Sequence, residues 1–116
     1  MNEKIEKMLK DGMNVEIELK TIAQAMLVIR QMHGENSLLE EFANDLTFVR
    51  RKRKKISRLI QSLPDDNTRQ VFTHRYINAL TWDDVADASY VSVAHAHRLH
   101  KKGLEKLKKV LDNIEL

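Results

Sequence analysis

Apolar residues recur every three or four positions along most of the chain, which is the spacing of one helix face. In the first half, two stripes follow this spacing: Val15, Leu19, Ile22, Met26, Ile29 and His33, and then Leu39, Phe42, Leu46, Val49, Arg53, Ile56, Ile60 and Leu63. The alternation predicts heptad seams on two helices, over residues 2–33 and 37–62. Apolar and acidic residues also alternate over residues 15–19, so a short strand is an alternative there, but the length of the pattern favours a helix.

Local signals mark where these helices break or end. Asp11-Gly12 is a possible break in the first helix, Gly34 stops it, and Asn36 or Ser37 can cap the second. Pro64 ends the second helix because proline lacks a backbone donor and restricts the residue before it. Neither helix buries its stripe alone, so we expect residues 1–63 to form an antiparallel helical hairpin or coiled coil. We hypothesise that this half forms a homodimer.

Residues 64–116 predict a second unit of shorter helices. Apolar stripes follow three candidate caps: Asp65 and Asp66 precede Val71, Phe72, Tyr76 and Ile77; Thr81 precedes Trp82, Val85 and Ala86; and Ser92 precedes Ala96, Leu99, Leu104, Leu107 and Leu111. Thr81 and Asp84 nearly match a capping box, and residues 88–91 break the pattern. Two short helices, a tight turn and a longer helix outline a helix-turn-helix. The predicted fold class is therefore all-α, a helical hairpin followed by a helix-turn-helix domain.

Composition narrows the class of protein. One proline and three glycines in 116 residues favour helix almost throughout. The absence of cysteine excludes disulfides and thiolate metal sites and suits a reducing cytoplasm. Residues 1–10 are too polar for a secretory signal, and no apolar run approaches the ~20 residues of a membrane span. Without a glycine-rich phosphate loop, a nucleophile motif or a paired-carboxylate site, we expect neither an enzyme nor a cofactor.

Charge is segregated along the chain. Residues 1–49 hold five basic and nine acidic side chains, residues 50–63 hold seven basic and no acidic ones, and residues 64–116 hold eight of each. A local positive cluster suggests a polyanionic partner, although a charge run is also typical of a solvated helix face. If the partner is duplex DNA, the candidate phosphate contacts are Arg50, Arg51, Lys52, Lys54 and Lys55.

In a helix-turn-helix, the first turns of the second helix reach phosphates and base edges in the major groove. Here the candidate DNA-binding residues are Ser92, Val93, Ala94, His95, His97, Arg98, Lys101 and Lys102. Small side chains at 93 and 94 allow close approach of the backbone. Arg98 reads guanine or holds a phosphate, and the two lysines suit phosphates.

The three histidines of this helix also suggest a metal site. At about 100° per residue, however, only His97 and His100 can approach one ion, and cysteine is absent. We therefore expect no metal, DNA contact for His95 and His97, and a packing role for His100. Trp82 is expected in the core rather than stacked on bases, and the Tyr90 hydroxyl is within reach of a phosphate.

The stretch "RYINALTWDDVADASYVSVAHAHRLHKKGLEKL" resembles region 4 of bacterial sigma factors, and more closely the phage-encoded transcriptional regulators of the ArpU type. The resemblance covers residues 64–111. It rests on Arg75-Tyr76, on Thr81 to Ala86 in the supporting helix, on Ser92, and on Arg98 to Lys101 leading to Leu104 and Leu107. Two positions depart from the family. Ser89 replaces a leucine anchor, and Gly103 replaces alanine, at a cost of about 1 kcal/mol in a helix interior, with a kinked or softened last helix as the result.

The resemblance implies transcriptional regulation by sequence-specific binding of duplex DNA, in a phage or prophage setting. Together with the uncovered hairpin and the absence of cysteine, it leads us to expect a cytoplasmic, homodimeric regulator. The alternative is a phage assembly or packaging component, or an adaptor of RNA polymerase, that carries a helix-turn-helix but has little DNA affinity of its own.

Overall fold

The computed structural model describes residues 3–32 and 36–114, and all regular structure within them is helical. The elements are α1 (Glu3–Met13), α2 (Val15–Gln31), α3 (Asn36–Gln61), α4 (Asp66–Phe72), the π-helix η1 (Thr73–Ile77), α5 (Trp82–Ala88) and α6 (Val93–Ile114). The all-α prediction is thus confirmed, and residues 15–19 are helix rather than strand.

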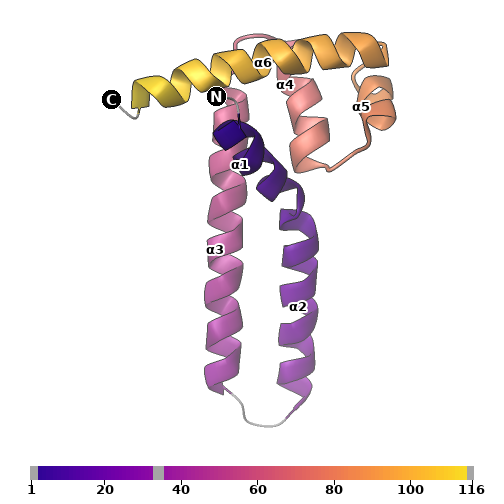
Figure 1. The fold of residues 1–116 in the computed structure, drawn as a ribbon. Coiled ribbons are helices and arrows are strands. Elements are labelled where there is room, and N and C mark those ends of the chain that lie inside the picture. The colour runs from indigo at the N-terminus through magenta and orange to yellow at the C-terminus, as the bar shows by residue number, and fades with distance from the viewer. Residues whose placement is uncertain (1–2, 33–35, 115–116) are drawn as a thin grey trace.

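Helices α2 and α3 form the predicted antiparallel hairpin, a long shaft that extends from the rest of the molecule (Figure 1). The predicted seams lie between them, with Val15, Ile29 and Val49 buried. Arg53, the charged member of the second seam, donates to Glu16 Oε2 at 3.0 Å. This ion pair explains how a charge is tolerated beside the seam. The predicted stop at Gly34 lies outside the described residues.

The predicted break at Asp11-Gly12 is wrong by a few residues, because α1 continues to Met13 and the turn falls at Asn14. Gly12 is helical and buried, and a Cβ there would lie 2.5 Å from Ile56 Cδ1. The glycine thus allows α1 to cross closely over α3 rather than ending the helix. Figure 1 shows that α1 turns away from the shaft to lie beside α3 and the layer formed by α4, α5 and α6.

The second half contains the predicted caps. The Asp65 carboxylate accepts from the backbone N–H of Thr68 at 3.2 Å and from its hydroxyl at 2.7 Å. The hydroxyl bond is the main cause of the lowered pKa of Asp65. The Thr81 hydroxyl accepts from the N–H of Asp84 at 3.3 Å, and the Ser92 hydroxyl accepts from the N–H of His95 at 3.1 Å. Each expected helix of this half therefore begins where its cap predicts.

The main core joins residues from both sides of Pro64. Its buried members are Ile5 and Leu9 of α1, Ile56 and Ile60 of α3, Leu63, Phe72, Tyr76 of η1, and Leu104 and Leu107 of α6. A smaller core lies under the turn of the helix-turn-helix and contains Val71, Val85, Ala86 and Ala96. The first core fixes the shaft to the second half of the chain, and the second core holds α5 against the start of α6.

Gly103 corrects a second expectation from the sequence, that it would kink or soften the last helix. Helix α6 is continuous through this position. A Cβ on Gly103 would lie 2.3 Å from Cε1 of Phe72 and 2.9 Å from Cγ2 of Thr68. The missing side chain lets α6 pass directly over the buried Phe72 ring. None of the helices among the described residues is long and apolar enough to cross a membrane.

Candidate DNA-binding surface

The turn between α5 and α6 has the geometry of a Schellman motif. The N–H of Val91 donates to the carbonyl of Ala86 at 3.0 Å, and the N–H of Tyr90 donates to that of Asp87 at 3.2 Å. Val91 also packs with Ala86 in the smaller core. The motif fixes the angle between the two helices with only a few residues.

Tyr90 occupies the left-handed position of this motif, with φ of 58°. Glycine is the usual residue there, because a Cβ costs roughly 1–2 kcal/mol in that conformation. The Tyr90 side chain is nevertheless 93% exposed. No glycine or asparagine marks this position in the sequence, so sequence reasoning missed the strained backbone.

Ser89 is buried, as expected of a residue that replaces a core anchor. It is 5% exposed, and its hydroxyl has no hydrogen-bond partner in the structure. An unpaired buried hydroxyl is unfavourable, because it loses its bonds to water.

A cluster of rings and one guanidinium group joins the supporting helices to α6. Trp82 lies at its centre, with its ring centroid 4.4 Å from that of His97 and 4.9 Å from that of His100. The Arg75 guanidinium lies 4.8 Å from the same centroid, and its Nη1 donates to the carbonyl of Leu80 at 2.8 Å. Trp82 is thus a half-buried packing residue, in agreement with the expectation from the sequence.

His100 has the packing role predicted for it. It stacks on Phe72 with centroids 5.2 Å apart, and its Nε2 lies 2.5 Å from the Tyr76 hydroxyl. Burial, helped by the nearby His97, Arg75 and Lys10, lowers the pKa of His100 to about 4. Burial also raises the pKa of Tyr76 to about 12, so both groups are neutral near pH 7.

The first turns of α6 present the candidate DNA-binding residues to solvent. Ser92, Val93, Ala94, His97, Arg98, Lys101 and Lys102 are exposed, and His95 is half-buried. Ala96 is fully buried beneath them and Leu99 packs with it. His95 and Arg98 lie side by side, since Arg98 Nη2 is 3.5 Å from His95 Nδ1. His97 is exposed but its ring lies on Trp82, which limits its reach.

The part of the chain that contains these helices matches a known family. Residues 59–109 match the Sigma-70, region 4 family. That family is a DNA-binding helix-turn-helix domain, and in sigma factors it also contacts the RNA polymerase core. The match confirms the resemblance to sigma region 4 seen in the sequence and covers less than half of the chain. No curated protein and no solved structure matches the chain.

The basic run of α3 forms a separate surface. Arg50, Arg51, Lys54 and Lys55 are exposed and Lys52 is half-buried. These residues lie on the shaft, whereas α6 begins beside α5, at the end of its layer farther from α3 (Figure 1). The structure therefore does not merge the two groups of candidate contacts into one patch. Among the described residues, no three His, Cys, Asp or Glu side chains are grouped closely enough to hold a metal ion.

Proposed function

We propose that this protein is a sequence-specific, duplex-DNA-binding regulator of transcription that inserts the start of α6 into the major groove. The observation that carries the proposal is the two-sided construction of α6. Its first turns expose basic and small side chains on one side, while Ala96 and Leu99 pack on the supporting helices on the other. The match of residues 59–109 to sigma region 4 supports the same conclusion.

Individual roles follow from side-chain chemistry. Arg98 is suited to a bidentate contact with guanine or to a phosphate, and Lys101 and Lys102 are suited to phosphates. Ser92, Val93 and Ala94 let the backbone approach the DNA, and His95 and His97 contact the groove edge. We assign the Tyr90 hydroxyl, on the adjoining turn, to a contact with a phosphate.

We further propose that the protein acts in the cytoplasm as a homodimer and is encoded by a phage or prophage. The phage setting rests on the resemblance of residues 64–111 to ArpU-type regulators. The basic run Arg50, Arg51, Lys52, Lys54 and Lys55 adds phosphate contacts that do not depend on sequence.

An adaptor of RNA polymerase is the second candidate function, with a phage assembly or packaging component as a variant of it. Tyr90 favours this reading, since a strained and almost fully exposed aromatic residue is typical of a contact with a partner. An adaptor would show little affinity for DNA at any salt concentration, whereas a DNA-binding regulator would show strong salt dependence.

Selection of bound duplexes from a random pool, followed by titration of two variants, tests the proposal. Arg98→Ala should cost roughly 1–3 kcal/mol of binding free energy and relax the preference at one base pair if Arg98 reads guanine. Arg50→Ala with Lys54→Ala should weaken all duplexes alike, with a loss of about 0.9 units in the salt slope per lost phosphate contact. Equal behaviour of the two variants, or no selected sequence, would contradict the assignment.

A further inference from the structure

Helix α3 carries a second stripe of residues, separate from its seam with α2. The stripe repeats with heptad spacing and consists of Glu41, Asn44, Asp45, Phe48, Arg51, Lys52 and Lys55, here called the Phe48 face. All of these side chains are exposed except that of Lys52, which is half-buried. Phe48, at the centre, is 70% exposed.

Exposed apolar side chains also occur on α2. Ile17 is 66% exposed there, and Val28 and Met32 follow at helical spacing with 54% and 64% of their surface exposed. Seen along α2, Ile17 and Val28 lie roughly 100° or more from the buried seam positions Val15 and Ile29, whereas Met32 follows the end of the helix. Helix α2 therefore exposes two apolar side chains, Ile17 and Val28, on the side away from its seam, with the polar Thr21 and Gln24 beside them.

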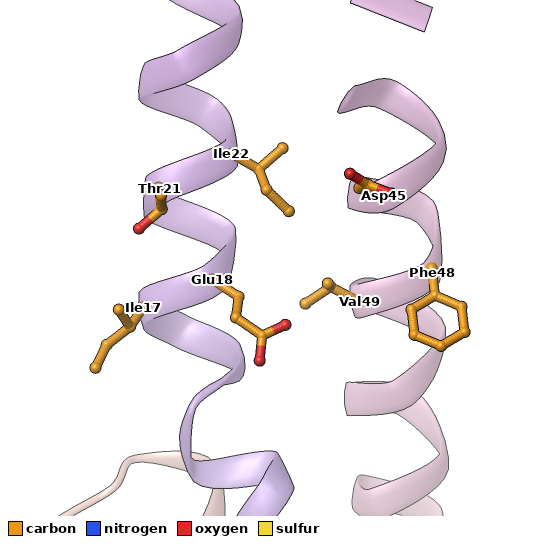
Figure 2. Close-up of a pocket in the computed structure, with 7 residues that line it drawn as sticks. All are labelled: Ile17, Glu18, Thr21, Ile22, Asp45, Phe48 and Val49. Carbon is orange, nitrogen blue, oxygen red and sulfur yellow. The ribbon is translucent and has the colours of Figure 1, made fainter. Parts of the chain in front are cut away.

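A groove separates the two helices beside Phe48. Figure 2 shows Glu18, Ile22 and Val49 between the helices, whereas Ile17 and Phe48 lie on the outer sides of α2 and α3 in this view. Its volume is about 380 Å³. For comparison, an engineered cavity of about 150 Å³ holds benzene, so the groove has room for an aromatic side chain.

On the Phe48 face, the acidic residues precede Phe48 and the basic residues follow it at nearly the same spacing. Glu41 lies seven residues before Phe48 and Lys55 lies seven residues after it. Asp45 lies three residues before it, and Lys52 lies four after it. The ends of this pattern are too far apart to pair within one helix, since fourteen residues span roughly 21 Å. Within the part of the chain that the structure describes, neither Glu41 nor Lys55 makes an ion pair.

We propose that the Phe48 face binds the Phe48 face of a second copy of this chain, with the two α3 helices antiparallel about a two-fold axis at Phe48. In this arrangement Glu41 of each copy lies against Lys55 of the other, Asp45 against Lys52, and Asn44 against Arg51. Every contact occurs twice, as a two-fold interface requires. The two Phe48 rings meet at the centre and cover the grooves. The inference rests on the proposed function, because it specifies the surface through which the proposed homodimer forms.

Duplex DNA fits this face less well than a second copy does. The phosphates would be attracted by Arg51, Lys52 and Lys55 but repelled by Glu41 and Asp45 in the same stripe. Arg50 and Lys54 lie roughly 200° and 240° around the helix from Phe48, so they remain free for phosphates when the two copies are bound. In the dimer, therefore, only Arg50 and Lys54 of the five proposed phosphate contacts keep that role, and Arg51, Lys52 and Lys55 face the second copy instead.

A charge-exchange experiment with the full chain tests the interface. Analytical ultracentrifugation should show a dimer for the unmodified protein at micromolar concentration. In a dimer of the Glu41→Lys variant, position 41 of each copy would meet Lys55 of the other, so like charges meet at two places. The Lys55→Glu variant likewise brings two pairs of acidic side chains together. Each variant should therefore self-associate at least tenfold more weakly. An equimolar mixture of the two variants pairs opposite charges at both places and should recover a dimer within a few-fold of the original affinity. Failure of the mixture to associate would overturn the proposal.

Two further variants separate the interface from folding and from DNA binding. Phe48→Ser should abolish dimerisation with an unchanged helical circular dichroism spectrum, because the side chain is already exposed. Arg50→Glu with Lys54→Glu, on the other side of α3, should leave the dimer intact. A monomer that still binds DNA would overturn this inference and the proposed homodimer but not the proposed DNA binding, whereas a dimer with no affinity for DNA would overturn only the proposed DNA binding.

Discussion

The hydroxyl of Tyr76 lies 2.5 Å from Nε2 of His100, and this contact joins η1 to the middle of α6. Both groups are neutral near pH 7, since burial lowers the pKa of His100 to about 4 and raises that of Tyr76 to about 12. We assign the hydroxyl as donor and Nε2 as acceptor. The pair lies within the aromatic cluster that orients the proposed recognition helix, so its protonation affects the packing behind the DNA-binding surface.

Stability should fall in mild acid because of His100. The unfolded chain binds a proton at His100 near its ordinary pKa of 6.5, whereas the folded protein resists protonation down to about pH 4. The free energy of unfolding should therefore decrease as the pH falls from 6.5 to 4, by about 1–2 kcal/mol after allowance for partial exposure of the ring. Urea titrations at pH 4.5 and 7.5 measure the difference. The variant His100→Gln should show a smaller loss, and an equal loss would show that other groups cause it.

The two helical glycines should respond differently to alanine. At Gly103 the new Cβ would meet the ring of the fully buried Phe72 at 2.3 Å, and a ring cannot bend aside. Overpacking of this kind costs about 1–3 kcal/mol, which exceeds or cancels the helix-propensity gain of about 1 kcal/mol. At Gly12 the new Cβ would meet the flexible end of Ile56, so Gly12→Ala should be close to neutral. Thermal melts of both variants test the contrast, and a more stable Gly103→Ala protein would contradict it.

Ser89→Ala should stabilise the protein by about 1 kcal/mol. The substitution removes a buried hydroxyl that has no hydrogen-bond partner, and it leaves the backbone of the turn unchanged. Chemical denaturation provides the measurement. The exposed Ser92→Ala change is the matched control, and it should destabilise instead, because the Ser92 hydroxyl caps α6. A loss of stability in Ser89→Ala would indicate that the hydroxyl is paired in solution.

Tyr90→Gly should increase stability and weaken binding. Glycine adopts the φ of 58° without a Cβ penalty, so a gain of about 0.5–1 kcal/mol is expected after its greater backbone entropy is counted. Affinity for the partner of this surface should fall, because a 93% exposed ring is lost. Melting temperature and DNA affinity are measured on the same sample. Tyr90→Phe separates the hydroxyl from the ring: a phosphate contact predicts weaker DNA binding for this variant too.

Local patterns in the sequence determined most of the helices, because periodicity and caps act over a few residues. The seams on α2 and α3 and the caps at Asp65, Thr81 and Ser92 lie where the pattern predicts them. The exposure of the first turns of α6 also follows from its apolar stripe, since burial of the apolar side of a helix leaves the opposite side exposed. Their contact with DNA remains a prediction.

Only the tertiary structure decided the use of Gly12 and Gly103, because each lies against a side chain far away in the sequence, Ile56 and Phe72. A propensity scale assigns a glycine a cost, but at Gly103 the buried Phe72 ring makes the missing side chain a requirement. The same holds for Tyr90, whose left-handed backbone is imposed by the joint packing of α5 and α6. The order of acidic, aromatic and basic residues around Phe48 was present in the sequence. Only the tertiary structure showed that these residues are available to a partner, because α2 covers another side of α3 and leaves the Phe48 face exposed.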